Sequence, residues 1–186
     1  VVPTGNFGDI MAGWYAFKMG LPVGRLVCAS NKNDVLTEFL NTGHYDRKRE
    51  FYKTTSPSMD ILVSSNLERL LWYICGPEHT VQYMKQLEET GEYQITDNEL
   101  FEMQKVFTGV FASDDEGAAA IKEVFDAEHY LMDTHTSIAW ACMEKYRSGD
   151  APAGTVPFGS DAKEAVVLST ASPYKFSAAV LRALGE

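Results

Sequence analysis

The chain has 186 residues, of which 45% are hydrophobic and 23% charged, a composition typical of a folded globular domain. Its 16 basic and 26 acidic residues give a formal net charge of −10, which argues against nucleic acid or an anionic membrane as partner, because both require a basic face. The sequence has no apolar run near the roughly 20 residues of a membrane span and no signal-peptide pattern, and its three scattered cysteines suit the reducing cytoplasm better than a disulfide framework or a zinc site.

The first stretch combines the end of a strand, a glycine turn and the start of a helix. Residues 1–3 are apolar, residues 4–8 read TGNFG, and apolar side chains then recur at helical spacing from Ile10 to Leu21. Glycines let a ligand approach the backbone closely, and the first turn of a helix offers unpaired N–H groups. The pattern predicts a phosphate site, although a glycine turn with a purely steric role fits the shape equally well.

The next segment predicts a β-α-β unit followed by a helix and a loop. An apolar run at 25–29 indicates a second buried strand, parallel to the first. Asn33 or Asp34 caps a helix that ends at Gly43. Residues 45–58 are polar and predict a loop, whose basic Arg-Lys-Arg cluster is more typical of a solvated surface than of a phosphate clamp.

The middle of the sequence predicts successive helices. Residues 61–75 and 77–90 have helical apolar spacing on either side of a Gly-Pro break. Capping boxes at 96–99 and 113–116 start two more helices. We therefore expect residues 76–128 to be almost wholly helical, as a helical insertion in an α/β chain.

The last third predicts a helix, a loop, a strand and a final helix. Asp133 or Thr134 caps the first helix. Residues 150–160 carry prolines and glycines and predict a loop. The run at 164–169 is apolar on both faces, as in an interior parallel strand, and the Ser-Pro pair at 172–173 starts the last helix.

Five segments have distinctive sequences: PTGNFGDIMAG at 3–13, SPSMDI at 56–61, SSNLERLL at 64–71, DTHT at 133–136 and LSTASPYKF at 168–176. In sequence and order they resemble segments of the bacterial and fungal threonine synthases, a branch of the fold-type II pyridoxal-phosphate enzymes. The resemblance runs through essentially the whole chain. It implies a three-layer α/β fold with a parallel sheet, similar to the tryptophan synthase beta subunit, in which residues 1–186 are the C-terminal part of the cofactor-binding catalytic region.

The resemblance assigns the cofactor phosphate to the first segment, at Gly5, Asn6, Phe7, Gly8 and Asp9. Backbone N–H groups, helped by Asn6, would hold the dianion at the helix N-terminus. The carboxylate of Asp9 would repel a phosphate, so we expect it to cap the helix from the outer side.

The resemblance places Thr170 against the pyridine nitrogen of the cofactor. The alternative is that Thr170 caps the following helix, since hydroxyls favour that position. The segment departs from the usual family motif TAHPAKF, because Ser172 replaces a histidine and Tyr174 replaces a small residue.

The other family-like segments contribute candidate cleft residues, Ser58, Ser65, Asn66 and His135. The Ser65-Asn66 pair is as consistent with simple helix polarity as with a site. A lone histidine beside a helix start is more often a packed or capping residue than a catalytic one, and His129 and His135 lack the spacing of a metal pair.

The implied activity is that of a lyase in threonine biosynthesis, which uses pyridoxal 5'-phosphate to convert O-phospho-L-homoserine and water to L-threonine and phosphate. None of the lysines has the family's Schiff-base context, so we expect that lysine in a missing N-terminal half, and this fragment alone to be inactive. One alternative is a non-catalytic phosphate-binding domain. Another is a different fold-type II enzyme, such as an amino-acid deaminase or β-replacement enzyme, but the segments after residue 50 favour threonine synthase.

Overall fold

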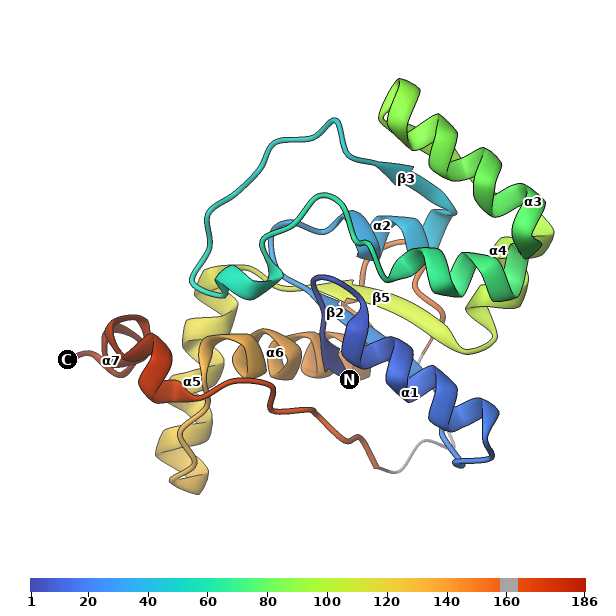
Figure 1. The fold of residues 1–186 in the computed structure, drawn as a ribbon. Coiled ribbons are helices and arrows are strands. Elements are labelled where there is room, and N and C mark those ends of the chain that lie inside the picture. Colours follow the sequence, from blue (N-terminus) through green and yellow to red (C-terminus); the bar gives the residue numbers. More distant parts are fainter. Residues whose placement is uncertain (158–163) are drawn as a thin grey trace.

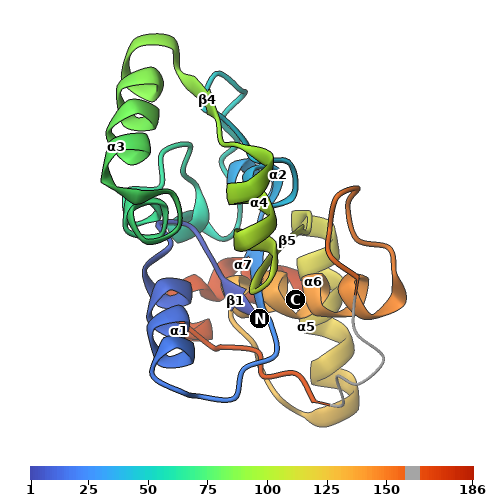
Figure 2. The same cartoon turned by 90° about the vertical axis from the view of Figure 1, so that its right-hand side faces the viewer.

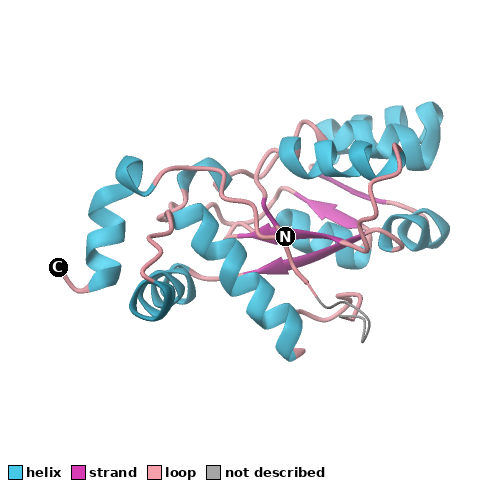
Figure 3. Cartoon of the chain, turned by 90° about the horizontal axis from the view of Figure 1, so that it is seen from below, coloured by secondary structure: helices cyan, strands magenta, loops and turns pink. Residues whose placement is uncertain are grey.

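The computed structural model of the chain describes residues 1–157 and 164–186. Within these ranges three parallel strands form the central sheet, in the order β1 (Val2–Pro3), β2 (Leu26–Ser30) and β5 (Phe107–Phe111). Figure 1 shows this sheet in the middle of the molecule, and Figure 3 shows helices on both sides of it. The parallel pairing of β1 with β2 confirms the β-α-β unit predicted at the start of the chain.

The other elements surround this sheet. The helices of the described residues are α1 (Gly8–Lys18), α2 (Val35–Thr42), α3 (Leu67–Thr90), α4 (Asp97–Gln104), α5 (Asp114–Glu128), α6 (Thr134–Ser148) and α7 (Ser177–Leu184). Short 3-10 helices occur at η1 (Pro57–Met59) and η2 (Pro173–Phe176), and β3 (His44–Asp46) pairs antiparallel with β4 (Glu92–Gln94). The β4 strand packs beside α3, at one end of the molecule (Figures 1 and 2).

Alternate residues of β2 contribute to two separate hydrophobic clusters. Leu26 and Cys28 belong to the cluster formed with α1, α2 and α3. Val27 and Ala29 belong to the cluster formed with α5 and α6. Because successive side chains of a strand point to opposite faces, the sheet is buried on both sides, which confirms the three-layer α/β architecture.

The predicted helix boundaries in the middle of the chain are largely confirmed. Thr96 and Ser113 accept the N–H groups of Glu99 and Glu116, and each glutamate carboxylate accepts the N–H of its cap residue in return. At Gly76 the backbone leaves the helical region, with φ 78° and ψ 169°, so α3 is kinked at the predicted break.

The helix predicted over residues 61–75 begins later than expected, at Leu67. Residues 61–66 are irregular because they bind the N-terminal glycine loop. The hydroxyl of Ser64 and the N–H of Ser65 both donate to that loop. These contacts override the apolar spacing, so this part of the prediction is wrong.

The prediction that residues 76–128 are nearly all helical is also wrong, because β4 and β5 lie within them. Phe107, which lies within the range predicted to be helical, is the first residue of β5. Gly109 lets β5 lie directly against α2, since a Cβ there would stand 2.6 Å from Thr37 Cα. A five-residue segment such as FTGVF is compatible with a helix or a strand, and tertiary packing decides between them. The strand β3 likewise lies at the start of the predicted loop 45–58.

The strand predicted at 164–169 is not formed. The segment lies along β1 through two hydrogen bonds, from the Val1 amino group to Val166 O (2.7 Å) and from Leu168 N to Val1 O (3.0 Å). Val166 is 72% exposed and Leu168 39%. At its end, Ser169 Oγ accepts from Thr136 Oγ1 at 3.2 Å. These bonds do not form the ladder of an interior strand, so this prediction is wrong for the described residues.

The last helix is preceded by the 3-10 turn η2, which follows Ser172 and begins with Pro173. Val180 is buried, whereas Leu181 is 49% exposed. Residues 158–160, the end of the predicted loop, lie outside the described residues.

Three further observations concern the described part of the chain. No helix there has the length and hydrophobicity needed to cross a membrane. No group of three or more histidine, cysteine, aspartate or glutamate side chains is arranged to hold a metal ion there. Cys28, Cys75 and Cys142 are free thiols.

Candidate functional site

The glycine loop joins the end of β1 to the N-terminus of α1. The N–H of Thr4 donates to Ala29 O (2.8 Å), which extends the pairing of β1 with β2 by one residue. The chain then turns through residues 5–7, and Phe7 adopts the left-handed conformation with φ 62° immediately before α1. The N–H groups of residues 8–10 lie in the first turn and have no intrahelical acceptor. The loop therefore leads into unpaired backbone N–H donors at the N-terminus of α1, where the helix dipole is positive. Such an environment binds anions.

Two residues of the loop, Gly5 and Phe7, contribute to its packing. The ring of Phe7 is 1% exposed and packs against Phe107, with ring centroids 5.7 Å apart. A Cβ at Gly5 would stand 2.7 Å from Ser58 O, so glycine is required for η1 to pack on the loop. Gly8 has room for a side chain, since its nearest neighbouring atom would be 3.7 Å away.

The outer side of the loop is bound by the segment that precedes α3. The side-chain oxygen of Asn6 accepts hydrogen bonds from the N–H (2.7 Å) and hydroxyl (3.0 Å) of Ser65. Asn66 Nδ2 donates to Asn6 O at 2.8 Å, and Ser64 Oγ donates to Gly5 O at 3.2 Å. The structure thus brings Asn6, Ser65 and Asn66 together, and these bonds fix the conformation of the loop.

His135 lies on the other side of the site, as the second residue of α6. Its Nε2 is 3.2 Å from the N–H of Ser58, and its Nδ1 is 3.1 Å from Asp133 Oδ1. Burial would raise the pKa of Asp133, but hydrogen bonds from His135 and Thr136 outweigh this effect and lower the pKa to about 2. Asp133 also caps α6 by accepting the N–H groups of both residues. The histidine is therefore held between a buried carboxylate and a backbone N–H group.

These elements enclose a cavity of about 250 Å³. Its lining includes nine of the ten predicted site residues: Gly5, Asn6, Phe7, Gly8, Asp9, Ser58, Asn66, His135 and Thr170. Ser65 lies behind Asn6 and is not part of the lining. The expectation that Asp9 caps α1 is wrong, because that helix has no side-chain cap; Asp9 is exposed at the rim, where water solvates its carboxylate.

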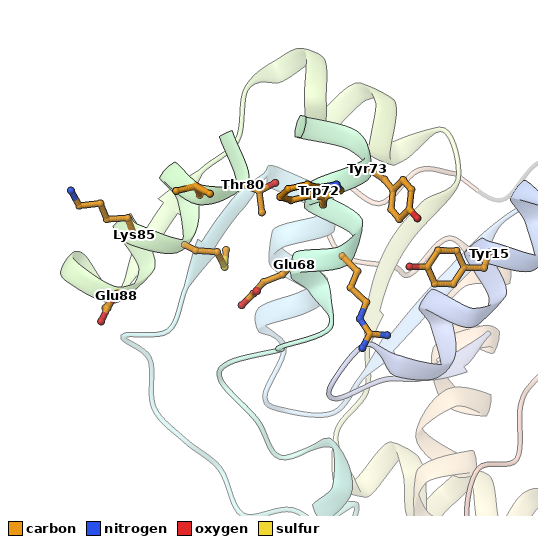
Figure 4. A pocket seen from close by; sticks show the side chains of 10 residues that line it. Tyr15, Glu68, Trp72, Tyr73, Thr80, Lys85 and Glu88 are labelled. Atoms are coloured by element: carbon orange, nitrogen blue, oxygen red, sulfur yellow. The ribbon is translucent and has the colours of Figure 1, made fainter. Parts of the chain in front are cut away.

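A larger groove of about 640 Å³ lies between α1 and the two halves of α3 (Figure 4). Its wall contains half-exposed aromatic side chains, with Trp72 53% and Tyr73 59% exposed, and residues of both charges such as Arg69 and Glu88. It contains neither the glycine loop nor the helix N-terminus. The smaller cavity therefore has the features of an anion site, and the larger one does not.

Comparisons with known proteins agree with this geometry. No protein-family model matches the sequence. Threonine synthase of Saccharomyces cerevisiae is 37% identical over 199 residues, which cover 99% of this chain and 37% of the relative. The crystal structure of pyridoxal-phosphate-bound threonine synthase from Brucella melitensis superposes with a TM-score of 0.86, at 40% identity over all of this chain and 38% of that one. The chain is homologous to threonine synthases.

The yeast threonine synthase structure gives a TM-score of 0.87 at 36% identity, again over all of this chain and 38% of the other. The chain thus has the fold of part of a threonine synthase, and spans less than two fifths of the length of these relatives. The resemblance identified from the five segments is confirmed.

Sequence reasoning missed several supports of the site. Asp133 was predicted only as a helix cap, and its contact with His135 depends on the geometry of the first turn of α6. Ser64 was not predicted to bind the glycine loop. A cluster in which Asn31 Nδ2 donates to Asp60 Oδ1 (2.7 Å) holds the chain on either side of η1. The sequence shows that these residues are polar, but it does not show that they contact one another.

Proposed function

We propose that the chain is part of the pyridoxal-phosphate-binding region of a threonine synthase. The whole enzyme would be a lyase that converts O-phospho-L-homoserine and water to L-threonine and phosphate in the cytoplasm. The observation that carries this proposal is the glycine loop at the N-terminus of α1, which opens into a cavity shared with Ser58, His135 and Thr170. The homology to threonine synthases supports the choice of activity.

The residues present fit the cofactor's phosphate group. The first-turn N–H groups of α1 supply donors and a positive helix end. Gly8 lines the cavity, and a Cβ there would have only Asn66 Nδ2 within 4 Å, at 3.7 Å, so glycine keeps the start of α1 open to a ligand. Asp9 lies at the rim, and its exposure to water weakens its repulsion of a dianion. We assign the cofactor phosphate to Gly5, Asn6, Phe7, Gly8 and Asp9, mainly through their backbone groups.

The remaining residues of the cavity would orient the cofactor ring and the substrate. The hydroxyl of Thr170 is assigned to the pyridine nitrogen, because it belongs to the same cavity as the glycine loop. Ser58 and Asn66 also line the cavity. When bound, the cofactor supplies an electron sink for proton removal from the amino-acid substrate. None of the residues that line the cavity is a lysine, so we assign the covalent attachment to the rest of the enzyme and expect this chain alone to be inactive.

Titration of the isotope-labelled chain with pyridoxal 5'-phosphate tests the site. We expect the amide resonances of residues 5–9 to shift, and inorganic phosphate to shift the same resonances more weakly. Pyridoxal without its phosphate is the matched control ligand and should leave them almost unchanged. Movement confined to the basic cluster at 47–49 would refute the assignment of the phosphate to the glycine loop.

Borohydride reduction tests the expected inactivity. The proposal predicts no unique lysine adduct and no threonine formation by this chain alone. A cofactor adduct on one lysine together with turnover of O-phosphohomoserine would contradict it.

A further inference from the structure

The ring of His135 is fixed on both nitrogens. The side chain is 3% exposed, and its ring packs against that of Phe176 with centroids 4.7 Å apart. Nδ1 faces the carboxylate of Asp133, and Nε2 faces the backbone N–H of Ser58. The ring therefore has a defined partner at each polar atom.

These partners determine the tautomer. The N–H of Ser58 can only donate, so Nε2 must be the acceptor. The proton of the neutral imidazole then lies on Nδ1, where it is donated to Asp133 Oδ1. Asp133 is itself fixed, because it accepts the N–H groups of His135 (2.8 Å) and Thr136 (3.3 Å) as well as the hydroxyl of Thr136.

Ser58 belongs to η1, the wall that faces the glycine loop. Its carbonyl oxygen would be 2.7 Å from a Cβ at Gly5, so the loop and η1 are already in close backbone contact. On its far side, η1 is continuous with Asp60, whose carboxylate accepts from Asn31 (2.7 Å) and from Thr54 Oγ1 (2.7 Å). The hydrogen bond from Ser58 N to His135 Nε2 links this wall to α6.

We propose that His135 is a positioning residue, whose Nε2 lone pair holds η1 in place and so sets the distance between Ser58 and the glycine loop. The expected effect of His135 on ligand binding rests on the proposed function, because the cavity between these two walls is the one assigned to the cofactor phosphate. His135 itself holds its proton on Nδ1 and transfers none in this role.

A pair of amide substitutions separates the two ends of the ring. In His135→Gln, the longer side chain carries its carbonyl oxygen to about the position of Nε2, where it can still accept from Ser58. In His135→Asn, the shorter side chain reaches only the position of Nδ1, so the acceptor for Ser58 is lost. Both variants are uncharged, and they differ only in which ring nitrogen they replace.

Nuclear magnetic resonance on the full chain provides the readout. In the wild type we expect the ¹⁵N shifts of an Nδ1–H tautomer and a scalar coupling across the hydrogen bond from Ser58 N to His135 Nε2. We expect His135→Asn to shift the amide resonances of Gly5 and Gly8 and to weaken pyridoxal 5'-phosphate binding about three- to tenfold, as for loss of one hydrogen bond. His135→Gln should retain the wild-type amide resonances of Gly5 and Gly8 and the wild-type affinity for pyridoxal 5'-phosphate.

The outcomes distinguish the two proposals. An Nε2–H tautomer, a missing coupling, or equal effects of the two variants on Gly5 and Gly8 would overturn the positioning role. If the coupling and the difference between the variants are found but the wild-type chain binds no pyridoxal 5'-phosphate, the positioning role stands and the proposed cofactor site is contradicted.

Discussion

Substitution of Gly5 by alanine tests whether the glycine loop is built by close packing. The added Cβ would stand 2.7 Å from Ser58 O and 3.0 Å from Met59 Cα, both backbone atoms. Ordinary contact begins near 3.4 Å, so η1 or the loop must move by several tenths of an ångström. Gly5 does not have a positive φ, so the expected effect comes from this contact and not from backbone strain. Overpacking of this kind destabilises by about 1–3 kcal/mol.

The matched control is Gly8→Ala, whose Cβ would have no neighbour nearer than 3.7 Å. Gly8 is in the first turn of α1, where alanine lowers the entropy of the unfolded chain and is expected to be neutral or to stabilise by about 0.4–1 kcal/mol. Urea unfolding of both variants measures the difference in free energy. We also expect Gly5→Ala to weaken binding of pyridoxal 5'-phosphate, since it displaces a wall of the cavity. Equal unfolding midpoints for the two variants would refute the packing argument.

Three further predictions follow from the same structure. Gly109→Ala should destabilise the chain by about 1–3 kcal/mol in urea unfolding, because its Cβ would stand 2.6 Å from Thr37 Cα; an unchanged midpoint would contradict the close contact of β5 with α2. Burial would raise the pKa of Glu99, but hydrogen bonds to its carboxylate, led by that from His79, lower the pKa from 4.5 to about 2. The stabilisation that Glu99 contributes should therefore be fully present above pH 4.5 and be lost as the pH falls toward 2. Glu99→Gln should reduce the dependence of the unfolding free energy on pH in that window. An unchanged pH dependence would contradict this role of Glu99. In the whole enzyme, Thr170→Val should weaken cofactor binding by about 1–3 kcal/mol, measured by absorbance titration; wild-type affinity would remove Thr170 from the pyridine contact.

The elements that local sequence chemistry specifies were predicted well. A capping box needs only a hydroxyl and a carboxylate three residues apart, so α4 and α5 could be located without any tertiary information. The same holds for the ends of α2 and α3 at Gly43 and Gly91, which both adopt the left-handed conformation. The kink at Gly76 also follows from residue type.

The elements that depend on distant partners were predicted poorly. The five residues of β5, FTGVF, are too few for their periodicity to distinguish a strand from a helix, and the pairing with β2 decides between the two. The apolar run at 164–169 has the composition of an interior strand, yet it bonds to β1 through Val1 alone and forms no strand among the described residues. In both cases the position of a neighbouring strand decides the outcome.

The sequence by itself determined the glycine turn before a helix and the caps of α4, α5 and α6, since each depends on residue type or on a short spacing. The resemblance to threonine synthases supplied nine residues that line one cavity. Only the tertiary structure decided how they act together. It places Ser58 in close contact with Gly5, directs one nitrogen of His135 to Ser58 and the other to Asp133, and buries the ring of Phe7 in the core. The contacts of Ser58 with Gly5 and with His135 join residues more than 50 positions apart, which local propensity does not describe. Packing and hydrogen-bond satisfaction in the folded chain select these contacts.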